Sequence, residues 1–441
     1  MATILSAVLA AGSILSWLEA ARAARWVALA ALAALALAYA ARRRALPPAT
    51  AVSLAACAFV AVAIVSAGWS AVPGSTAGRA LALAVLFAAA GALAWGTAGR
   101  PEAVRPLLYA VLAAVAIVAV GGLVVLAVDN DRAVQAATTE LAARYQGLGG
   151  GPNTATMVLA LGLPLAALAL VEARRRTARI GLAGLLALLA GSIVASGSRG
   201  ALLAGFGGLL AFALAAPATA RGRVLWGAAV VAAFVVGVLV SRIPKPESGR
   251  AATSAADAIP DRMPFSAAPG YVDANLVWRL QDDVGHPPPG VAETTRKPRT
   301  LLGSSGRAEA WRGAFELGGQ RPLLGFGFGT EQRVFADRYV GFNSAVPENS
   351  YLGLFLQTGA AGLALFLALV AALLARAGRA LAGLRGEQRL VAAAGGGVLV
   401  AGLVLGLFQS YLYAVGNNAT AALWICAFLL AASTARERVR V

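Results

Sequence analysis

The residues best suited to chemistry in this sequence are arginines and one glutamate near the ends of long apolar segments. They are Arg79, Arg199, Arg307, Arg312, Arg321 and Glu348. A charged side chain within hydrocarbon costs about 2.5–3.5 kcal/mol on insertion scales, so charged residues in or near the apolar segments are expected to have a structural or functional role. A guanidinium stays charged and offers a planar fork of donors to anionic oxygens, so arginines around a shared aqueous cavity suit a phosphate or pyrophosphate. The alternative for any single arginine is snorkelling to lipid headgroups or a salt bridge.

Arg199 lies in the sequence Ser196-Gly197-Ser198-Arg199-Gly200, between two apolar runs. This spacing predicts a tight turn that starts a helix, where free backbone N–H groups attract an anion. Ser198 is therefore expected to support anion binding beside Arg199. Asn153 follows three glycines and a proline and is expected to cap the next helix.

Glu348 has three open interpretations. As an early residue of a helix that starts near Pro347, it can complement the helix dipole. As a carboxylate beside a hydroxyl acceptor, it can act as a general base, which is the usual choice where no histidine is available. It can also pair with one of the arginines. Three residues that follow it are expected to support the same site: Asn349, Ser350 and Tyr351.

Other reactive residue types are scarce. The only histidine, His286, lies in a proline-rich stretch, and both cysteines, Cys57 and Cys426, lie within apolar runs. This composition disfavours a metal site, a disulfide framework and a Ser-His-Asp triad. The glycine-rich stretch 325–329 lacks a preceding strand and a following lysine, so it favours a packed backbone turn over a nucleotide loop. We expect no metal and no cofactor.

The segments that must position these residues are apolar enough to span a membrane. The chain is 59% hydrophobic and 13% charged, with a mean hydropathy of +0.74. Such a composition predicts an all-α, polytopic bundle of about a dozen transmembrane helices. The predicted spans are 2–19, 26–41, 51–69, 80–98, 106–127, 154–172, 180–196, 200–217, 224–241, 349–375, 390–411 and 419–434.

The arginines between the spans predict the topology. Clusters such as Arg42–Arg44 and 174–179 alternate with arginine-poor connections, which places both termini in the cytoplasm by the positive-inside rule. Arg22 and Arg25 then lie on the wrong side, which questions the first hairpin. The same distribution explains the net charge of +17 without nucleic-acid binding, for which no motif is present.

Three regions follow from this topology. Residues 1–241 hold helices one to nine, 242–348 form a polar extracytoplasmic loop or lid, and 349–441 hold helices ten to twelve. The stretch from Gly306 to Leu317 has a helical pattern within the loop. No internal repeat of the kind found in many transporters is visible.

An ordered set of motifs resembles the O-antigen ligase and O-antigen polymerase superfamily of bacterial membrane glycosyltransferases. The motifs are Trp69-Ser70 before Arg79, Pro152-Asn153, the turn 196–200, Gly306-Arg307 with Trp311 and the stretch 322–327, and 348–352 with 357–359 and Gly362. The resemblance covers nearly the whole chain and implies a GT-C-type fold built on transmembrane helices.

The resemblance further implies a metal-independent transfer of a glycan from an undecaprenyl-pyrophosphate carrier to a glycan or glycolipid hydroxyl, at the outer face of a bacterial inner membrane. Arg199 and Arg307 would hold the pyrophosphate, assisted by Arg79. Apart from the resemblance, Arg312 is a further candidate for pyrophosphate binding among the arginines named above. The family commonly has His-Asn-Ser where this chain has Glu348-Asn349-Ser350, so the base assignment and the acceptor stay open. Ligase and polymerase share these motifs.

Two other functions are compatible with many apolar helices. A transporter or flippase of lipid-linked glycans would need charges near the middle of helices, whereas here the charges gather at one face. A scaffold for envelope assembly would need none of the arginines.

Overall fold

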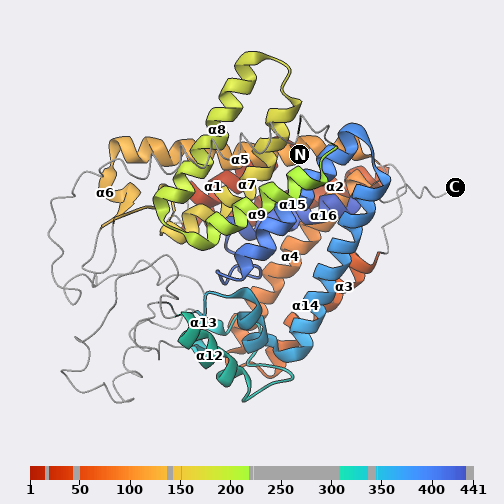
Figure 1. The fold of residues 1–441 in the computed structure, drawn as a ribbon. Helices are drawn as coiled ribbons and strands as arrows, with labels where there is room; N and C mark the ends of the chain where they lie inside the picture. Colours follow the sequence, from red (N-terminus) through yellow and green to blue (C-terminus); the bar gives the residue numbers. More distant parts are fainter. Residues whose placement is uncertain are drawn as a thin grey trace.

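The computed structural model describes residues 1–14, 19–42, 50–98, 100–136, 143–149, 151–217, 222, 307–335, 344 and 346–433. The predicted span 224–241, most of the loop and His286 therefore lie outside the described residues. In the described part, long helices dominate, and their arrangement is drawn in Figure 1.

The long helices are α1 (Ala2–Ile14), α2 (Glu19–Arg42), α3 (Ala51–Val65), α4 (Pro73–Thr97), α5 (Pro101–Val128), α7 (Pro152–Glu172), α8 (Arg176–Ser196), α9 (Arg199–Ala215), α14 (Ser350–Gly383), α15 (Gly386–Gly406) and α16 (Asn418–Ala432). The short elements are the 3₁₀ helix η1 (Ser66–Gly68), α6 (Asn130–Ala133), α12 (Arg307–Gly318) and α13 (Glu331–Val334). Strands β1 (Val134–Gln135) and β2 (Arg144–Tyr145) pair antiparallel, with Val134 opposite Tyr145.

The predicted all-α polytopic fold class is confirmed. Within the described residues, eight helices are long and apolar enough to cross a membrane, and α9 and α16 are shorter apolar helices. Each predicted span except 224–241 has a matching helix, and α12 occupies the stretch with the predicted helical pattern. The observed α4 begins several residues earlier than predicted, because Pro73 suits the first helical turn.

Small residues let the helices approach closely. Where α9 crosses α15, a Cβ added at Gly208 would lie 2.7 Å from the carbonyl oxygen of Gly397, so only glycine fits. Pro164 of α7 packs into the same crossing. Because hydrocarbon gives no hydrophobic drive for helices to associate, such close backbone packing holds membrane bundles together.

Long helices joined by short connections alternate in direction, so their ends lie in two groups at opposite ends of the bundle. At one end, here called the site end, α4, α7, α9, α14 and α16 begin and α3, α5, α8 and α15 finish. The Arg25 guanidinium of α2 donates a 2.8 Å hydrogen bond to the Gly416 carbonyl, which places the start of α2 at the site end too. This hydrogen bond gives Arg25 a structural role at a position that the positive-inside rule disfavours.

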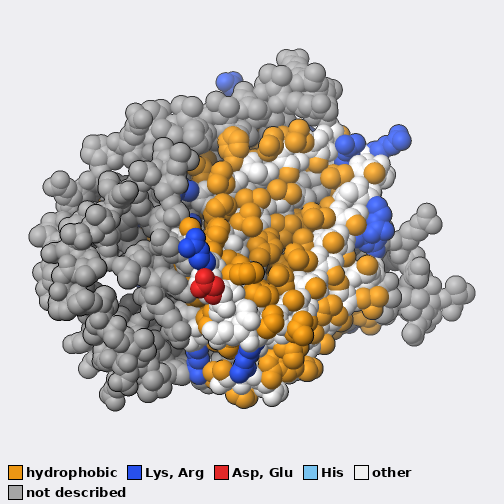
Figure 2. All heavy atoms as spheres, turned by 60° about the horizontal axis from the view of Figure 1, so that its bottom comes forward, with side chains coloured by type: hydrophobic (Ala, Val, Ile, Leu, Met, Phe, Trp, Pro, Cys, Tyr) orange, Lys and Arg blue, Asp and Glu red, His pale blue; other side chains and the backbone are white. Residues whose placement is uncertain are grey.

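The opposite end is held by an ion cluster. Arg105 of α5 lies 3.3 Å from the carboxylate of Glu172 on α7 and 2.8 Å from that of Glu387 on α15. Between the two ends, apolar side chains cover much of the surface, as the face in Figure 2 shows. The bundle thus has two polar ends and an apolar belt, as expected of a membrane protein.

Candidate functional site

The centre of the site end is a loop, residues 322–330, that inserts into a break in α14. Inside α14, Gly359 has φ +63° and ψ −165°, which is non-helical. The break leaves some backbone N–H and C=O groups of α14 without hydrogen-bond partners in the helix, and the loop provides those partners. The Ala360 N–H donates to the Pro322 carbonyl (2.7 Å), while the Gln357 carbonyl accepts from the Gly327 N–H (2.8 Å).

The same loop is tied to the connection between α3 and α4. The Phe328 N–H donates a 2.9 Å hydrogen bond to Ser66 Oγ, and the Trp69 indole donates one of 3.1 Å to the Leu324 carbonyl. Three glycines of the loop, Gly325, Gly327 and Gly329, have positive φ. The glycine-rich stretch is thus a tightly packed backbone turn, in line with the interpretation favoured from the sequence.

Arg79 lies in the second turn of α4 and reaches the loop. Its guanidinium donates a hydrogen bond to the Gly329 carbonyl, and its aliphatic part occupies the space where a Cβ of Gly329 would be. The loop therefore fixes the position of this arginine. Burial and then the charge of Arg79 lower the pKa of Arg333 on α13, so two cations share this region.

Glu331, the first residue of α13, is a buried carboxylate beside these cations. Its side chain accepts hydrogen bonds from Tyr413 (2.5 Å), Ser410 (2.7 Å) and Gln357 (3.2 Å), and the residue is 4% exposed. Burial raises the pKa of the Glu331 carboxyl to about 7, although the bonds from Tyr413 and Ser410 and the charge of Arg79 lower it. A group that titrates near neutral pH in a protein interior is a functional candidate.

Arg307 and Glu348 form a direct ion pair at the start of α14. Two nitrogens of the guanidinium bond one carboxylate oxygen, the Nε distance being 3.1 Å, and both side chains are about one-fifth exposed. Glu348 has φ +48°, the only positive value among the described non-glycine residues. Of the three interpretations of Glu348, pairing with an arginine is the one whose contact is present in this structure.

The three residues after Glu348 are held by the segment between α15 and α16. Asn349 caps α14 by accepting from the Tyr351 and Leu352 N–H groups. Ser350 is fully buried, donates to the Gln409 carbonyl (2.6 Å) and accepts from Tyr411 N–H (2.9 Å). The Tyr351 hydroxyl donates to the Leu403 carbonyl. Their observed contacts fix the backbone around Glu348.

Arg199 is the first residue of α9, after the predicted turn, in which Gly197 has φ +65°. The adjoining Gly200 packs directly against Phe408, two residues before Ser410, which bonds Glu331. The turn at Arg199 and the buried carboxylate are thus connected through one short segment. Arg199 is half-buried, and Ser198 is buried.

Arg144 joins this turn to the start of α7. Its Nε donates to the Ser196 carbonyl (2.6 Å), and its guanidinium also donates to the Asn153 side chain (2.9 Å). The sequence suggested a cap for Asn153, whereas the N-cap of α7 is Gly151 and Asn153 lies inside the helix. That expectation was wrong in detail, because Pro152 takes the first helical position.

Arg312 and Arg321 lie apart from these contacts. Both are exposed, Arg312 on α12 and Arg321 just after it, where its guanidinium lies 5.0 Å from the centre of the Phe326 ring. On the buried side of α12, Trp311 donates a 2.9 Å hydrogen bond to the Pro347 carbonyl and holds the helix beside Glu348.

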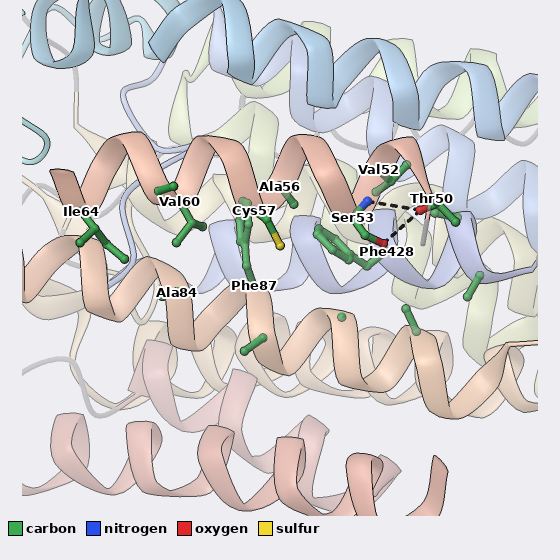
Figure 3. Close-up of a pocket in the computed structure, with 16 residues that line it drawn as sticks. Thr50, Val52, Ser53, Ala56, Cys57, Val60, Ile64, Ala84, Phe87 and Phe428 are labelled. Atoms are coloured by element: carbon green, nitrogen blue, oxygen red, sulfur yellow. Dashed lines mark hydrogen bonds between the residues drawn. The ribbon is translucent and has the colours of Figure 1, made fainter. Parts of the chain in front are cut away.

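An apolar groove of about 490 Å³ runs along α3, between α3, α4 and α16. Figure 3 shows it extending from Thr50 and Ser53 at one end to Ile64 at the other, with Cys57, Phe87 and Phe428 along its length. Ile64 precedes Ser66, the residue that binds the inserted loop. The groove thus ends beside the site end.

Sequence reasoning missed Glu331, Arg333, Arg144, Ser410 and Tyr413. An acidic residue directly after Thr330 resembles an ordinary first-turn residue, so only its burial reveals it. Within the described residues, no group of three or more His, Cys, Asp or Glu side chains could hold a metal ion.

Comparisons with known proteins add the following. Residues 184–367 match the family model described as O-antigen ligase. One solved structure, "Structural coordination of polymerization and crosslinking by a peptidoglycan synthase complex", matches at 18% identity with a TM-score of 0.42, covering 87% of this chain and 97% of that chain. No curated protein matches the sequence.

Proposed function

We propose, on the premise that residues 184–367 of this chain form an O-antigen ligase domain, that the protein transfers a glycan from a polyprenyl-diphosphate carrier to a hydroxyl acceptor. The observation that carries the proposal is the placement of three arginines within the first two turns of three helices. Arg79 lies in α4, Arg199 begins α9 and Arg307 begins α12. At Arg199 and Arg307 the helix N-terminus adds a partial positive charge beside the guanidinium, which suits a diphosphate.

These arginines would act on the leaving group. As the acceptor oxygen bonds to the anomeric carbon, the bond from that carbon to the diphosphate oxygen breaks, and negative charge builds on the diphosphate. Fixed guanidinium groups stabilise that charge most in the transition state. A single displacement of this kind inverts the anomeric centre.

Glu348 is our candidate for the base that takes the acceptor proton. In the structure its carboxylate is engaged by Arg307, so a diphosphate that draws Arg307 away would free the carboxylate at the moment when a base is needed. Arg312, exposed on the same helix as Arg307, would extend the anion site outward.

The groove along α3 would hold the isoprenoid chain of the carrier. It is lined almost entirely by apolar and small side chains, lies at the depth of the membrane-spanning helices and ends beside the loop that fixes Arg79. The isoprenoid chain already lies in hydrocarbon, so its gain in the groove comes from van der Waals contacts, which grow in number with the length of the chain.

The site end would face the extracytoplasmic side of a bacterial inner membrane. Arginines are numerous at the opposite end, among them Arg174, Arg175, Arg176 and Arg179, as expected of cytoplasmic connections. Lipid-linked glycans for envelope assembly would reach the site from that outer leaflet.

The test is transfer of an oligosaccharide from undecaprenyl diphosphate by the protein in lipid nanodiscs, with release of undecaprenyl diphosphate as the measured product. We expect Arg199→Ala and Arg307→Ala each to lower the rate about 10²-fold. Arg379→Ala is the matched control, because Arg379 is an exposed arginine of α14 whose hydrogen bond among the described residues is to the Ala375 carbonyl of its own helix. Full activity in both test variants would refute the diphosphate role.

A further inference from the structure

The network around Glu331 has no part in the reaction as proposed so far. It combines a carboxylate that is 4% exposed with donors from two separate elements, Gln357 of α14 and Ser410 and Tyr413 of the segment after α15. Gly353 of α14 packs so closely that a Cβ there would lie 2.5 Å from a Glu331 carboxylate oxygen. The carboxylate is therefore held by three donors and packed against the backbone of α14.

The charges that face this carboxylate come from two elements. Arg79 of α4 interacts with it electrostatically, and Tyr413 is the titratable group that donates to it. Arg333 of the same short helix as Glu331 interacts with Arg79. Burial, then the charge of Glu331, raise the pKa of Tyr413 well above its usual value, so the phenol stays a donor.

A hydrogen bond and a short piece of backbone connect Arg79 to Glu331. Arg79 bonds the carbonyl of Gly329, and Glu331 follows two residues later. Among the described residues, no hydrogen bond or ion pair joins the side chains of Arg79 and Glu331 directly. Glu331 therefore uses none of the N–H donors of the Arg79 guanidinium. An anion at Arg79 and an ionised Glu331 would compete for the same positive charge.

We propose that Glu331 is a positioning residue whose protonation sets the diphosphate affinity of Arg79. With the carboxyl protonated, the charge of Arg79 acts on a diphosphate without opposition from Glu331. With the carboxyl ionised, its negative charge repels the diphosphate and favours release. The inference rests on the proposed function, because it takes Arg79 as part of the diphosphate site.

The direction of the effect follows from linkage. A bound anion disfavours a second negative charge nearby, so it raises the pKa of Glu331 and binding takes up a proton. By reciprocity, affinity falls as the pH rises through the pKa of this carboxyl, which is about 7 in the free protein.

The experiment measures the affinity of the full-length protein in nanodiscs for farnesyl diphosphate, between pH 5.5 and 8.5. The probe itself titrates in this range, so Glu331→Gln serves as the reference. We expect wild type and Glu331→Gln to bind within about twofold at pH 5.5, and Glu331→Gln to bind on the order of tenfold more tightly at pH 8.5. Parallel curves at all pH values would overturn the inference.

Tyr413→Phe gives an independent arm if Glu331→Gln does not fold. Loss of this donor removes a bond that lowers the pKa of Glu331, so the pH at which affinity declines should move upward. No upward movement would contradict the inference. Arg79→Ala separates the two proposals. If Arg79→Ala binds farnesyl diphosphate as tightly as wild type, the role of Arg79 in the proposed function is refuted. If Arg79→Ala loses affinity but wild type and Glu331→Gln give parallel pH curves, only the role of Glu331 is refuted.

Discussion

Arg307 and Glu348, which are 41 positions apart, meet as an ion pair at the entrance to α14. The first prediction separates the two partners. We expect Arg307→Ala to lose about 10²-fold in transfer rate, because the leaving diphosphate loses a cation. Glu348→Gln should lose activity only if the carboxylate takes the acceptor proton. The transfer rates of these two variants in the nanodisc assay, together with the pH profile of Glu348→Gln, distinguish a base at Glu348 from a residue that only pairs with Arg307.

If Glu348 were only the partner of Arg307, Glu348→Gln would free the guanidinium and bind the donor at least as tightly as wild type. An equal loss in kcat for both variants would instead support the proposed base. Positive φ at Glu348 gives a further control, since Glu348→Gly removes the carboxylate without backbone strain.

The second prediction concerns the break in α14. Gly359→Ala should destabilise the protein by more than 2 kcal/mol, because its φ and ψ are accessible essentially to glycine alone and the new Cβ would overlap the Leu323 backbone. Gly378→Ala, in the same helix with nothing within 4 Å of the new Cβ, should stabilise by about 0.5–1 kcal/mol. Thermal unfolding in detergent followed by size-exclusion chromatography measures both; equal effects would contradict the role of the break.

The third prediction tests the groove. Ala88→Trp would fill it, so we expect the KM for a long-chain donor to rise about tenfold and that for a farnesyl-linked donor to change little. Leu81→Trp, at an exposed position of the same helix that does not line the groove, is the control. If Ala88→Trp leaves the chain-length dependence unchanged, ordinary membrane lipid fills the groove instead.

The fourth prediction is a pH dependence of stability. The folded-state pKa of Glu331, about 7, lies above its unfolded value, so the native state binds more protons between these two values. Stability should therefore fall as the pH rises from about 5 to 8, by on the order of 3 kcal/mol from this carboxyl alone. Glu331→Gln should flatten that slope. A slope in Glu331→Gln equal to that of wild type would assign the effect to other groups.

The fifth prediction concerns Arg144, which sequence reasoning did not select. Arg144→Ala removes bonds that tie the turn before Arg199 to Asn153, so we expect a loss of activity with normal expression and a smaller loss in Asn153→Ala. Arg144→Lys should not restore activity, since one ammonium cannot replace two divergent guanidinium donors. Restoration by lysine would show that charge alone matters there.

The sequence by itself determined the apolar helices, their order and the ends at which arginines gather. These features are local, because a run of some twenty apolar residues can satisfy its backbone in hydrocarbon only as a helix. The motifs around Arg79, Arg199, Arg307 and Glu348 were readable for the same reason: each lies within a few residues of a predicted helix end.

Tertiary structure alone decided which charges meet. Glu331 became a candidate only when α14 and the segment after α15 buried it, and Glu348 was assigned a partner only when α12 was placed beside it. Spacing along the chain carries no information about such contacts, because hydrogen bonds and ion pairs act over a few ångströms in space. Which of several arginines neutralises a carboxylate therefore depends on how the helices pack, and packing is set by many small side chains at once.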